Sequence, residues 1–506
     1  MSTRRWTLLA VCLATFMLLL DITVVNVALP DIQRELDASF SDLQWVVDAY
    51  SLMLASVLLT AGSLADLFGR RRVFAIGVIL FSLASLLCGL AGSPTPLNLA
   101  RGFQGLGGAV MFACAPALLA QEFEGRERAS AFGIWGATIG LAVAIGPLVG
   151  GVLTESLGWE WIFFVNVPIG VLTAAIAVLY LREARPEHRP RLDWAGVVTF
   201  SAGLFCLVFA LIRGNAEGWG SAKIVGLLTA SALLLVGFVL VERHGKEPML
   251  DLTLFRKPAF TGAQITAFAI SASMFSMFLY LTLYIQNVLG YSPLHAGLRF
   301  LPVSILSFLA APIAGRLTDR VPIRLLLFGG LGAVGTGLLL MRGITPSDEW
   351  TTLLAGFCVA GLGVGFVNAP LSFTAVSVVP ARLSGTGAGI NNTFRQVGIA
   401  TGIAGLGAIF QSRVTDRLES LLAGSPVPGG RMHQLGEAIA SGGPDQATRF
   451  VPAGARDAVA EAARVAFIDG LNDILLVAAL IALVGAVLAL VLVRNGDLVA
   501  PGPPAA

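Results

Sequence analysis

The chain has 506 residues, of which 56% are hydrophobic and only 13% are charged. A mean hydropathy of +0.81 is far too apolar for a water-soluble chain of this length, which excludes a soluble multidomain enzyme. The 33 Lys and Arg nearly balance the 31 Asp and Glu, so no charge excess points to nucleic acid or to an acidic partner. We therefore expect an all-α polytopic protein whose main partner is the lipid bilayer.

Apolar segments that are long enough to cross a bilayer recur along the whole chain. Counting them predicts fourteen transmembrane helices, near residues 8–29, 44–65, 73–92, 97–120, 131–154, 161–181, 194–212, 222–241, 260–288, 296–314, 325–342, 351–378, 386–410 and 468–493. The first segment follows Arg4 and Arg5 as a signal peptide would, but it is too long and it contains Asp21. We interpret it as a retained span.

Cationic residues are concentrated in every second loop. If the N-terminus is cytoplasmic, the inner loops hold twenty Lys and Arg, including the run from Arg70 to Arg72. The short outer loops then hold only Arg34, Arg213, Lys223 and Arg342. The positive-inside rule therefore predicts a multi-pass protein of the cytoplasmic membrane with both termini in the cytoplasm. The long polar segment at about 411–466 falls on the outer face, where we expect short amphipathic helices, either as a spacer or with a role in gating.

Two stretches of the sequence repeat at a distance. The segment from Gly62 to Arg71 returns in degenerate form from Gly315 to Arg324, and Gly105-Leu-Gly107 returns as Gly361-Leu-Gly363. Such a parallel repeat predicts two six-helix bundles at 1–190 and 246–506, with two inserted helices at 191–245. A duplication of this kind places a substrate site between the halves and favours alternating access over a fixed pore.

Few ionisable residues lie inside the predicted spans. Asp21, Asp48 and Arg101 are the clearest, and a charge in the membrane usually faces a cavity, a partner or a proton path. Two carboxylates near the outer side and a fixed cation are the groups that a proton antiporter needs. The structural alternatives are a hydrogen bond between helices for Asp21, simple hydration for Asp48 and a helix-end anchor for Arg101.

Two further patterns concern helix packing and ligand binding. The fifth predicted span carries small or kinking residues that let another helix approach closely, either for transport or as ordinary packing: Gly133, Gly146, Pro147, Gly150 and Gly151. The ninth carries adaptable aromatic and Met residues, including Phe275 and Tyr284, which suit a lipophilic ligand but also serve as core or lipid-facing residues. The histidines and cysteines form no metal-binding pattern.

Seven motifs in order resemble the major facilitator superfamily, in particular its fourteen-span drug/proton antiporters of the EmrB/QacA type. The resemblance covers nearly the whole chain. It rests on Leu20–Pro30 in the first span, Gly62–Arg72 in the following loop, Arg101–Gly107 in the fourth span, Gly133–Gly151 in the fifth, Trp159–Pro168 in the sixth, and Tyr284–Gly297 and Asn391–Gln396 in the second half. Two positions depart from the pattern, Ala142 in place of a glycine and Glu160 in place of the usual arginine.

The resemblance implies efflux of small molecules driven by the proton gradient, with no other cofactor. It implies that Asp21 couples to protons, that Arg101 modulates the proton, and that Asp48 is a second acid. It also implies a conformational latch and a substrate cavity. The latch comprises Gly62, Asp66, Gly69, Arg70 and Arg71, and the cavity comprises Asn26, Gln104, Phe275, Tyr284, Gln286, Asn391 and Asn392.

The substrate is less closely defined than the mechanism. Asp48 matches an acid of relatives that export quaternary cations, whereas the spans of the second half carry no acid, so a singly charged cation or a neutral lipophile is expected. A dedicated exporter of one antibiotic, metabolite or lipid is the alternative, and a membrane sensor is a distant one. We expect no enzyme, because the spans hold no nucleophile, base or metal constellation. We expect a monomer.

Overall fold

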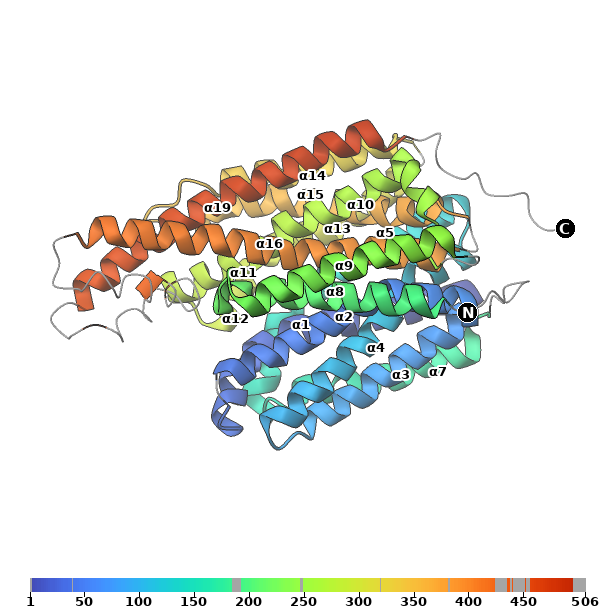
Figure 1. Ribbon diagram of the computed structural model, residues 1–506, viewed down its shortest axis with the longest axis horizontal. Helices are drawn as coiled ribbons and strands as arrows, with labels where there is room; N and C mark the ends of the chain where they lie inside the picture. Colours follow the sequence, from blue (N-terminus) through green and yellow to red (C-terminus); the bar gives the residue numbers. More distant parts are fainter. Residues whose placement is uncertain are drawn as a thin grey trace.

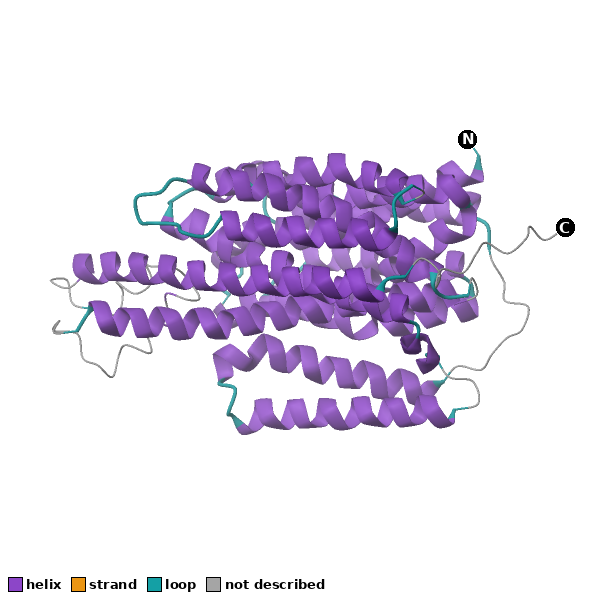
Figure 2. Ribbon diagram, turned by 90° about the horizontal axis from the view of Figure 1, so that it is seen from above, coloured by secondary structure: helices purple, strands orange, loops and turns teal. Residues whose placement is uncertain are grey.

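The computed structural model describes residues 2–38, 40–183, 193–245, 249–318, 320–380, 383–423, 435–436, 439, 451 and 456–494. Within these ranges all regular structure is helical, and the helices run side by side along the long axis of the molecule (Figures 1 and 2). Twelve of these described helices are long and apolar enough to cross a membrane, and shorter apolar helices lie at Leu148–Leu157 and Leu301–Leu317. The chain is therefore a multi-pass membrane protein.

The first half of the chain forms one group of packed helices. These are α1 (Thr3–Glu35), α2 (Phe40–Phe68), α3 (Arg70–Gly89), α4 (Pro94–Glu122), α5 (Gly125–Leu157), α6 (Trp161–Phe164) and α7 (Asn166–Tyr180). Helix α4 packs closely against α2 and α3 because glycines face both of them. A Cβ atom on Gly107 would lie 2.5 Å from the Phe81 nitrogen, and one on Gly105 would collide with the Tyr50 carbonyl. The polar residues of α4 are thereby held against α1, α2 and α3.

The two inserted helices form a hairpin, α8 (Trp194–Glu217) and α9 (Ala222–His244). The hairpin lies in front of the other helices in Figure 1 and at one edge in Figure 2. Helix α8 contacts α2 of the first half and α16 (Ser384–Leu421) of the second. Its Ser201 hydroxyl is 2.9 Å from that of Thr60 on α2, and its Asn215 amide donates to the Ala404 carbonyl of α16 at 3.2 Å. Helix α8 therefore contacts both halves.

The second half follows after a short η1 turn (Leu252–Arg256). It comprises α10 (Pro258–Ile270), η2 (Ser271–Phe275), α11 (Ser276–Leu283), η3 (Tyr284–Val288), α12 (Pro293–Arg299), α13 (Leu301–Leu317), α14 (Ile323–Leu340), η4 (Trp350–Leu353), α15 (Leu354–Ser377), α16 and α19 (Arg456–Leu492). The elements η2 and η3 are π-helical turns within one continuous helical segment. Such turns are rare and often lie at functional sites.

Helices α16 and α19 extend well beyond the others, at the left of Figure 1. Helix α16 has 38 residues, about 57 Å at 1.5 Å per residue, compared with a hydrocarbon core of about 30 Å. Ion pairs join the two extensions, Arg417 to Asp469 at 2.7 Å and Arg413 to Asp473 at 3.3 Å. The two ends of the predicted loop at 411–466 thus continue the flanking helices instead of forming separate short ones. Residues 424–434, 437–438, 440–450 and 452–455 of that loop lie outside the described residues.

The two halves meet tightly near the end of the molecule where α1 begins. Helix α2 packs on α16, where a Cβ atom on Gly389 would lie 2.8 Å from the Leu58 carbonyl. Helix α5 packs on α13, where a Cβ on Gly315 would lie 2.6 Å from the Ala129 carbonyl. In the orientation predicted from the sequence, this is the cytoplasmic side, and it is closed.

Candidate functional site

The Asp21 carboxylate lies at the centre of a buried polar network in the first half. Asp21 is 0% exposed, although a carboxylate is among the most costly groups to bury. Its Oδ2 accepts a hydrogen bond from Arg101 Nη1 at 2.6 Å. Its Oδ1 accepts from Gln104 Nε2 at 2.7 Å and from Asn166 Nδ2 at 3.0 Å. Three helices, α1, α4 and α7, thus converge on one carboxylate.

The Arg101 side chain is also fully buried and is fixed from several directions. Its Nε donates to the Val46 carbonyl of α2 at 2.8 Å, and its Nη1 donates to Gln104 Oε1 at 2.6 Å. Its guanidinium carbon lies 4.4 Å from the centre of the Tyr50 ring, a cation–π distance. Gln104 also donates to the Ser85 hydroxyl of α3 at 2.8 Å. A change in the charge of Asp21 would therefore alter the contacts that Arg101 makes with α2 and that Gln104 makes with α3.

The sequence had named Asp21, Arg101 and Gln104, and the structure brings these three together. It adds Asn166 and Ser85, which were not among the predicted site residues. Both are polar side chains within apolar spans, and Asn166 also lies in the motif at Trp159–Pro168, so these were the available signals. Gln104 had been expected to line the substrate cavity, but the structure places it in the Asp21 network with 0% exposure.

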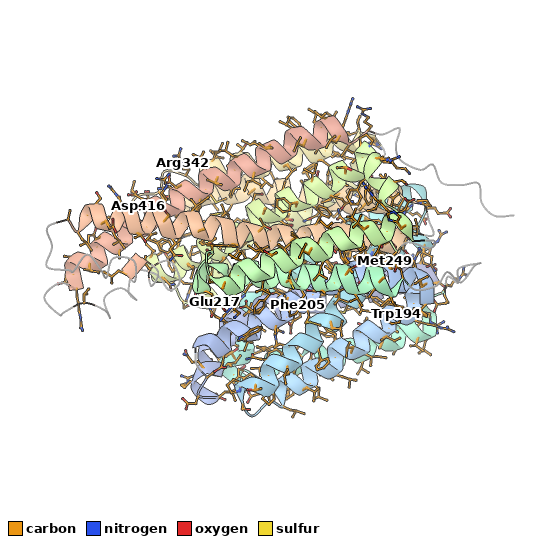
Figure 3. All side chains as sticks on the ribbon, viewed as in Figure 1. Trp194, Phe205, Glu217, Met249, Arg342 and Asp416 are labelled. Carbon is orange, nitrogen blue, oxygen red and sulfur yellow. The ribbon has the colours of Figure 1, made fainter. Side chains whose placement is uncertain are left out.

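The second predicted acid, Asp48, lies apart from this network. It is half-buried on α2, and the positive charge of Arg213 on α8 acts on it. Arg213 also donates to Gln44, one turn before Asp48, at 3.2 Å and to Glu217 at 3.1 Å. Hydrogen bonds from Lys223 and Arg213 lower the pKa of Glu217, which lies beyond the span at the C-terminal end of α8 (Figure 3). Asp48 is thus in the field of a cation from the inserted hairpin.

The predicted latch residues lie where the halves meet. The Asp66 carboxylate accepts hydrogen bonds from the backbone nitrogens of Gly385 at 3.1 Å and Thr386 at 2.8 Å, at the N-terminus of α16. Arg70 pairs with the same carboxylate at 2.9 Å. A carboxylate at a helix N-terminus is stabilised by the helix dipole and by the unpaired N–H groups there. Asp66 of the first half therefore caps a helix of the second.

The other three latch residues have different surroundings. Arg71 donates to the Val178 carbonyl at 2.6 Å, so it binds within its own half. A Cβ atom on Gly62 would collide with the Gly385 carbonyl, and Gly69 has a φ of +103°, which disfavours other residues. Gly62 is needed for the contact between the halves, and Gly69 for the turn into α3.

The glycines of the fifth span lie on several faces of α5. Gly146 and Gly150 face α1, where added Cβ atoms would collide with Thr23 and come within 3.1 Å of the Val24 Cα. Gly133 faces α13, 3.0 Å from the Pro312 Cα, and Gly151 faces Leu294 of α12 at 3.8 Å. Helix α5 therefore packs closely on both halves. The backbone of Pro147 is helical.

The remaining residues predicted for the substrate cavity differ in exposure. Asn26 is exposed, Phe275 and Gln286 are half-buried, and Tyr284 is buried; Phe275, Tyr284 and Gln286 lie in the two π-helical turns. Asn391 is buried and donates to Gln264 at 3.1 Å, and Asn392 is buried and donates to the Phe112 carbonyl of α4 at 3.4 Å. Asn392 thus connects the two halves. That any of these six residues contacts a substrate stays a prediction.

The fold and the buried network together define a membrane transporter: packed bundles of spanning helices with a charge network inside one of them. The chain matches the model of the Major Facilitator Superfamily over residues 11–403. The multidrug resistance protein Stp of Mycobacterium tuberculosis is 37% identical over 438 residues, covering 86% of this chain and 81% of Stp. The chain belongs to the Major Facilitator Superfamily.

Two other comparisons extend this result. The tetracenomycin C resistance and export protein of Streptomyces glaucescens is 35% identical, with 96% of this chain and 91% of that protein covered. The crystal structure of the human organic anion transporter MFSD10 superposes with a TM-score of 0.61 at 13% identity, covering 96% of this chain and 99% of that one. At that identity the structural similarity shows the fold alone. The family and fold indicate a transporter and not an enzyme, and the multidrug and antibiotic exporters among the relatives support drug efflux.

Proposed function

We propose that this protein exports lipophilic small molecules, cationic or neutral, in exchange for protons, by alternating access across the cytoplasmic membrane. The observation that carries the proposal is the fully buried Asp21 carboxylate, held by Arg101, Gln104 and Asn166 from two other helices. No other cofactor enters the proposal, since the proton gradient is the energy source.

Protonation of Asp21 is the coupling step in this mechanism. A proton on Asp21 removes the charge that pairs with Arg101, and the pair connects α1 to α4. Arg101 also binds the α2 backbone at Val46 and stacks on Tyr50, so α2 responds to the same event. Helix α2 in turn holds α16 through Asp66. Proton binding at Asp21 is thereby linked to the contact that closes the two halves at one end.

The proposal includes the membrane topology of the fourteen-span drug/proton antiporters. Twelve described helices qualify as spans, and α5 and the α12–α13 segment complete the count. Both termini are placed in the cytoplasm, which the distribution of Arg and Lys supports. The division into bundles at 1–190 and 246–506 with an insert at 191–245 is part of the same proposal.

A dedicated exporter of one natural product is the second candidate. It is favoured by the relatives that are named for single antibiotics: tetracenomycin C at 35% identity and puromycin at 38%, both from Streptomyces. A drug panel separates the candidates, because a dedicated exporter moves one chemical scaffold and a multidrug exporter moves several.

The test of proton coupling is drug-dependent proton flux in proteoliposomes that contain an entrapped pH dye. We expect flux with the wild type, no flux with Asp21→Asn, and wild-type flux with Asp469→Asn, whose carboxylate pairs with Arg417 on the outer extensions. Drug movement without proton flux in the wild type, or unchanged flux in Asp21→Asn, contradicts this mechanism. In the latter case Asp48→Asn is the next variant to measure.

A further inference from the structure

Arg395 is a cation within the second half that has no acid to balance it. From Pro258 to Phe410, the helices of that half contain no Asp or Glu in their sequence. Within the described residues, Arg395 makes one side-chain bond, from Nη2 to Asn368 Oδ1 on α15 at 2.8 Å. A guanidinium has five N–H donors, so four stay without a protein partner in the described part of the chain. An unpaired charge within a membrane span usually faces a ligand path.

The position of Arg395 on α16 directs it towards the interior of the protein. Helix α16 packs against α2, α4, α8, α10, α15 and α19, so most of its surface is covered by protein. Asn392, one turn before Arg395, reaches the Phe112 carbonyl of α4, and Asn368, which accepts from Arg395, is 2% exposed. Arg395 therefore lies on the face of α16 that meets α15, one turn after the contact of Asn392 with α4.

Arg395 lies where α16 becomes less buried. Every residue from Ser384 to Thr393 is buried, whereas those from Phe394 to Val397 are half-buried. None of the Arg395 nitrogens is enclosed without a partner, unlike Nε of Arg299. The N–H groups of Arg395 that have no protein partner are thus accessible and are not sealed within the helix packing.

Two carboxylates of the first half are each paired with an arginine. Asp21 pairs with Arg101 at 2.6 Å and Asp66 with Arg70 at 2.9 Å. Asp48, the acid that suggested a cationic substrate, lies in the field of Arg213 from α8. Arg395, by contrast, has no paired carboxylate among the described residues, and its one printed side-chain partner is the neutral Asn368.

We propose that Arg395, oriented by Asn368, is a substrate-recognition residue and that it selects lipophilic organic anions, namely carboxylates and phenolates, over lipophilic cations. A planar guanidinium with free donors binds the two oxygens of a carboxylate as a pair, or directs two N–H groups at the one oxygen of a phenolate, with a geometry that a lysine ammonium lacks. The inference rests on the proposed export function and revises its substrate class, from lipophilic cations or neutral molecules to lipophilic anions.

The test uses two probes on one scaffold, anthraquinone-2-carboxylate and its trimethylammoniomethyl analogue, and measures their uptake into inside-out vesicles. We expect the wild type to transport the acid. Arg395→Gln lowers the initial rate for the acid by about tenfold or more, the effect of losing a charged hydrogen bond, and leaves the cation rate unchanged or raised. The initial rate of Arg395→Lys for the acid lies between those of the wild type and Arg395→Gln. Arg342→Gln, the same change at an exposed arginine of the same half (Figure 3), behaves as the wild type.

The outcomes distinguish failure of the charge preference from failure of the export function. If Arg395→Gln slows both probes equally, or if the wild type exports cationic and neutral drugs but not the acid, the charge preference is wrong and export stands. If the wild type moves no member of a broad drug panel, the export function itself fails. Should Arg395→Gln not fold, thermal unfolding of the purified wild type decides: stabilisation by the acid but not by the cation supports the inference, and the reverse overturns it.

Discussion

At the scale of single residues, the buried network shows why Arg101 is an arginine. Its Nη1 binds both Asp21 and Gln104, its Nε binds the Val46 carbonyl, and its plane stacks on Tyr50. A lysine keeps the charge but lacks the planar fork, so it cannot satisfy three acceptors in these directions. The coupling role proposed for Asp21 depends on this geometry.

Arg101→Lys is therefore expected to impair transport although the charge is conserved. The loss of one charged hydrogen bond, about 1.5–3 kcal/mol, corresponds to a fall of about tenfold or more in the initial rate of drug export at a fixed proton gradient. The matched control is Arg34→Lys, at an exposed position on the same half. Export by Arg101→Lys at the wild-type rate, with the same number of protons per drug, would contradict this account.

At the scale of helices, the sequence predicted most spans well, because apolar length and loop charge are direct signals. The segment predicted at 97–120 is α4 (Pro94–Glu122), and that at 222–241 is α9 (Ala222–His244). The π-helical turns at Ser271–Phe275 and Tyr284–Val288 had no such signal, since they depend on backbone hydrogen bonding and on packing, the first against α16 and the second against α12. The long extensions of α16 and α19 were missed because their surfaces are polar, although Val414 and Leu418 form a buried apolar seam inside them.

The sequence identified the charged residues of the candidate site but not how they pair, because pairing depends on helix packing. Asp21 and Arg101 stood out as charges in apolar spans, but a sequence without pairing information cannot show that Arg101 is balanced and Arg395 is not. Arg213 illustrates the same limit. Its position at the end of a predicted span indicated an outer-loop cation, and only the packing of α8 on α2 brings it close to Asp48.

The capping of α16 by Asp66 leads to a prediction about this helix contact. Asp66→Asn removes the anion from the α16 N-terminus and from Arg70, and we expect it to destabilise the closed contact by about 1–2 kcal/mol. A buried cysteine at the contact, Asn392→Cys, should then react about five- to thirtyfold faster with an impermeant thiol reagent applied to inside-out vesicles. Asp473→Asn, on the extensions of α16 and α19 beyond the other helices, should not change that rate. Equal labelling with and without Asp66→Asn would show that the cap does not hold the halves together.

At the scale of the whole molecule, the closed end is built from two separate helix pairs. Helix α2 meets α16 at Gly62 and Gly389, and α5 meets α13 at Gly133 and Gly315. Glycines at these contacts allow the backbones to approach closely while few side chains interlock. A surface of this kind can separate and close again without repacking a core, which suits halves that rock against each other.

A reversible cross-link between the halves tests whether they must separate. A Cβ atom on Gly136 of α5 would lie 3.5 Å from the Ala311 Cβ of α13, within the range of a disulfide. Gly136 is about 16 Å along α5 from its start, on the closed side of the molecule. In a background without the native cysteines, we expect oxidised Gly136→Cys/Ala311→Cys to lose export and to regain it on reduction. The control link Thr60→Cys/Ser201→Cys joins α2 to α8, whose hydroxyls are 2.9 Å apart, and leaves the two bundles free to move. Full export by the oxidised Gly136→Cys/Ala311→Cys protein would rule out separation of α5 from α13 as a step in transport.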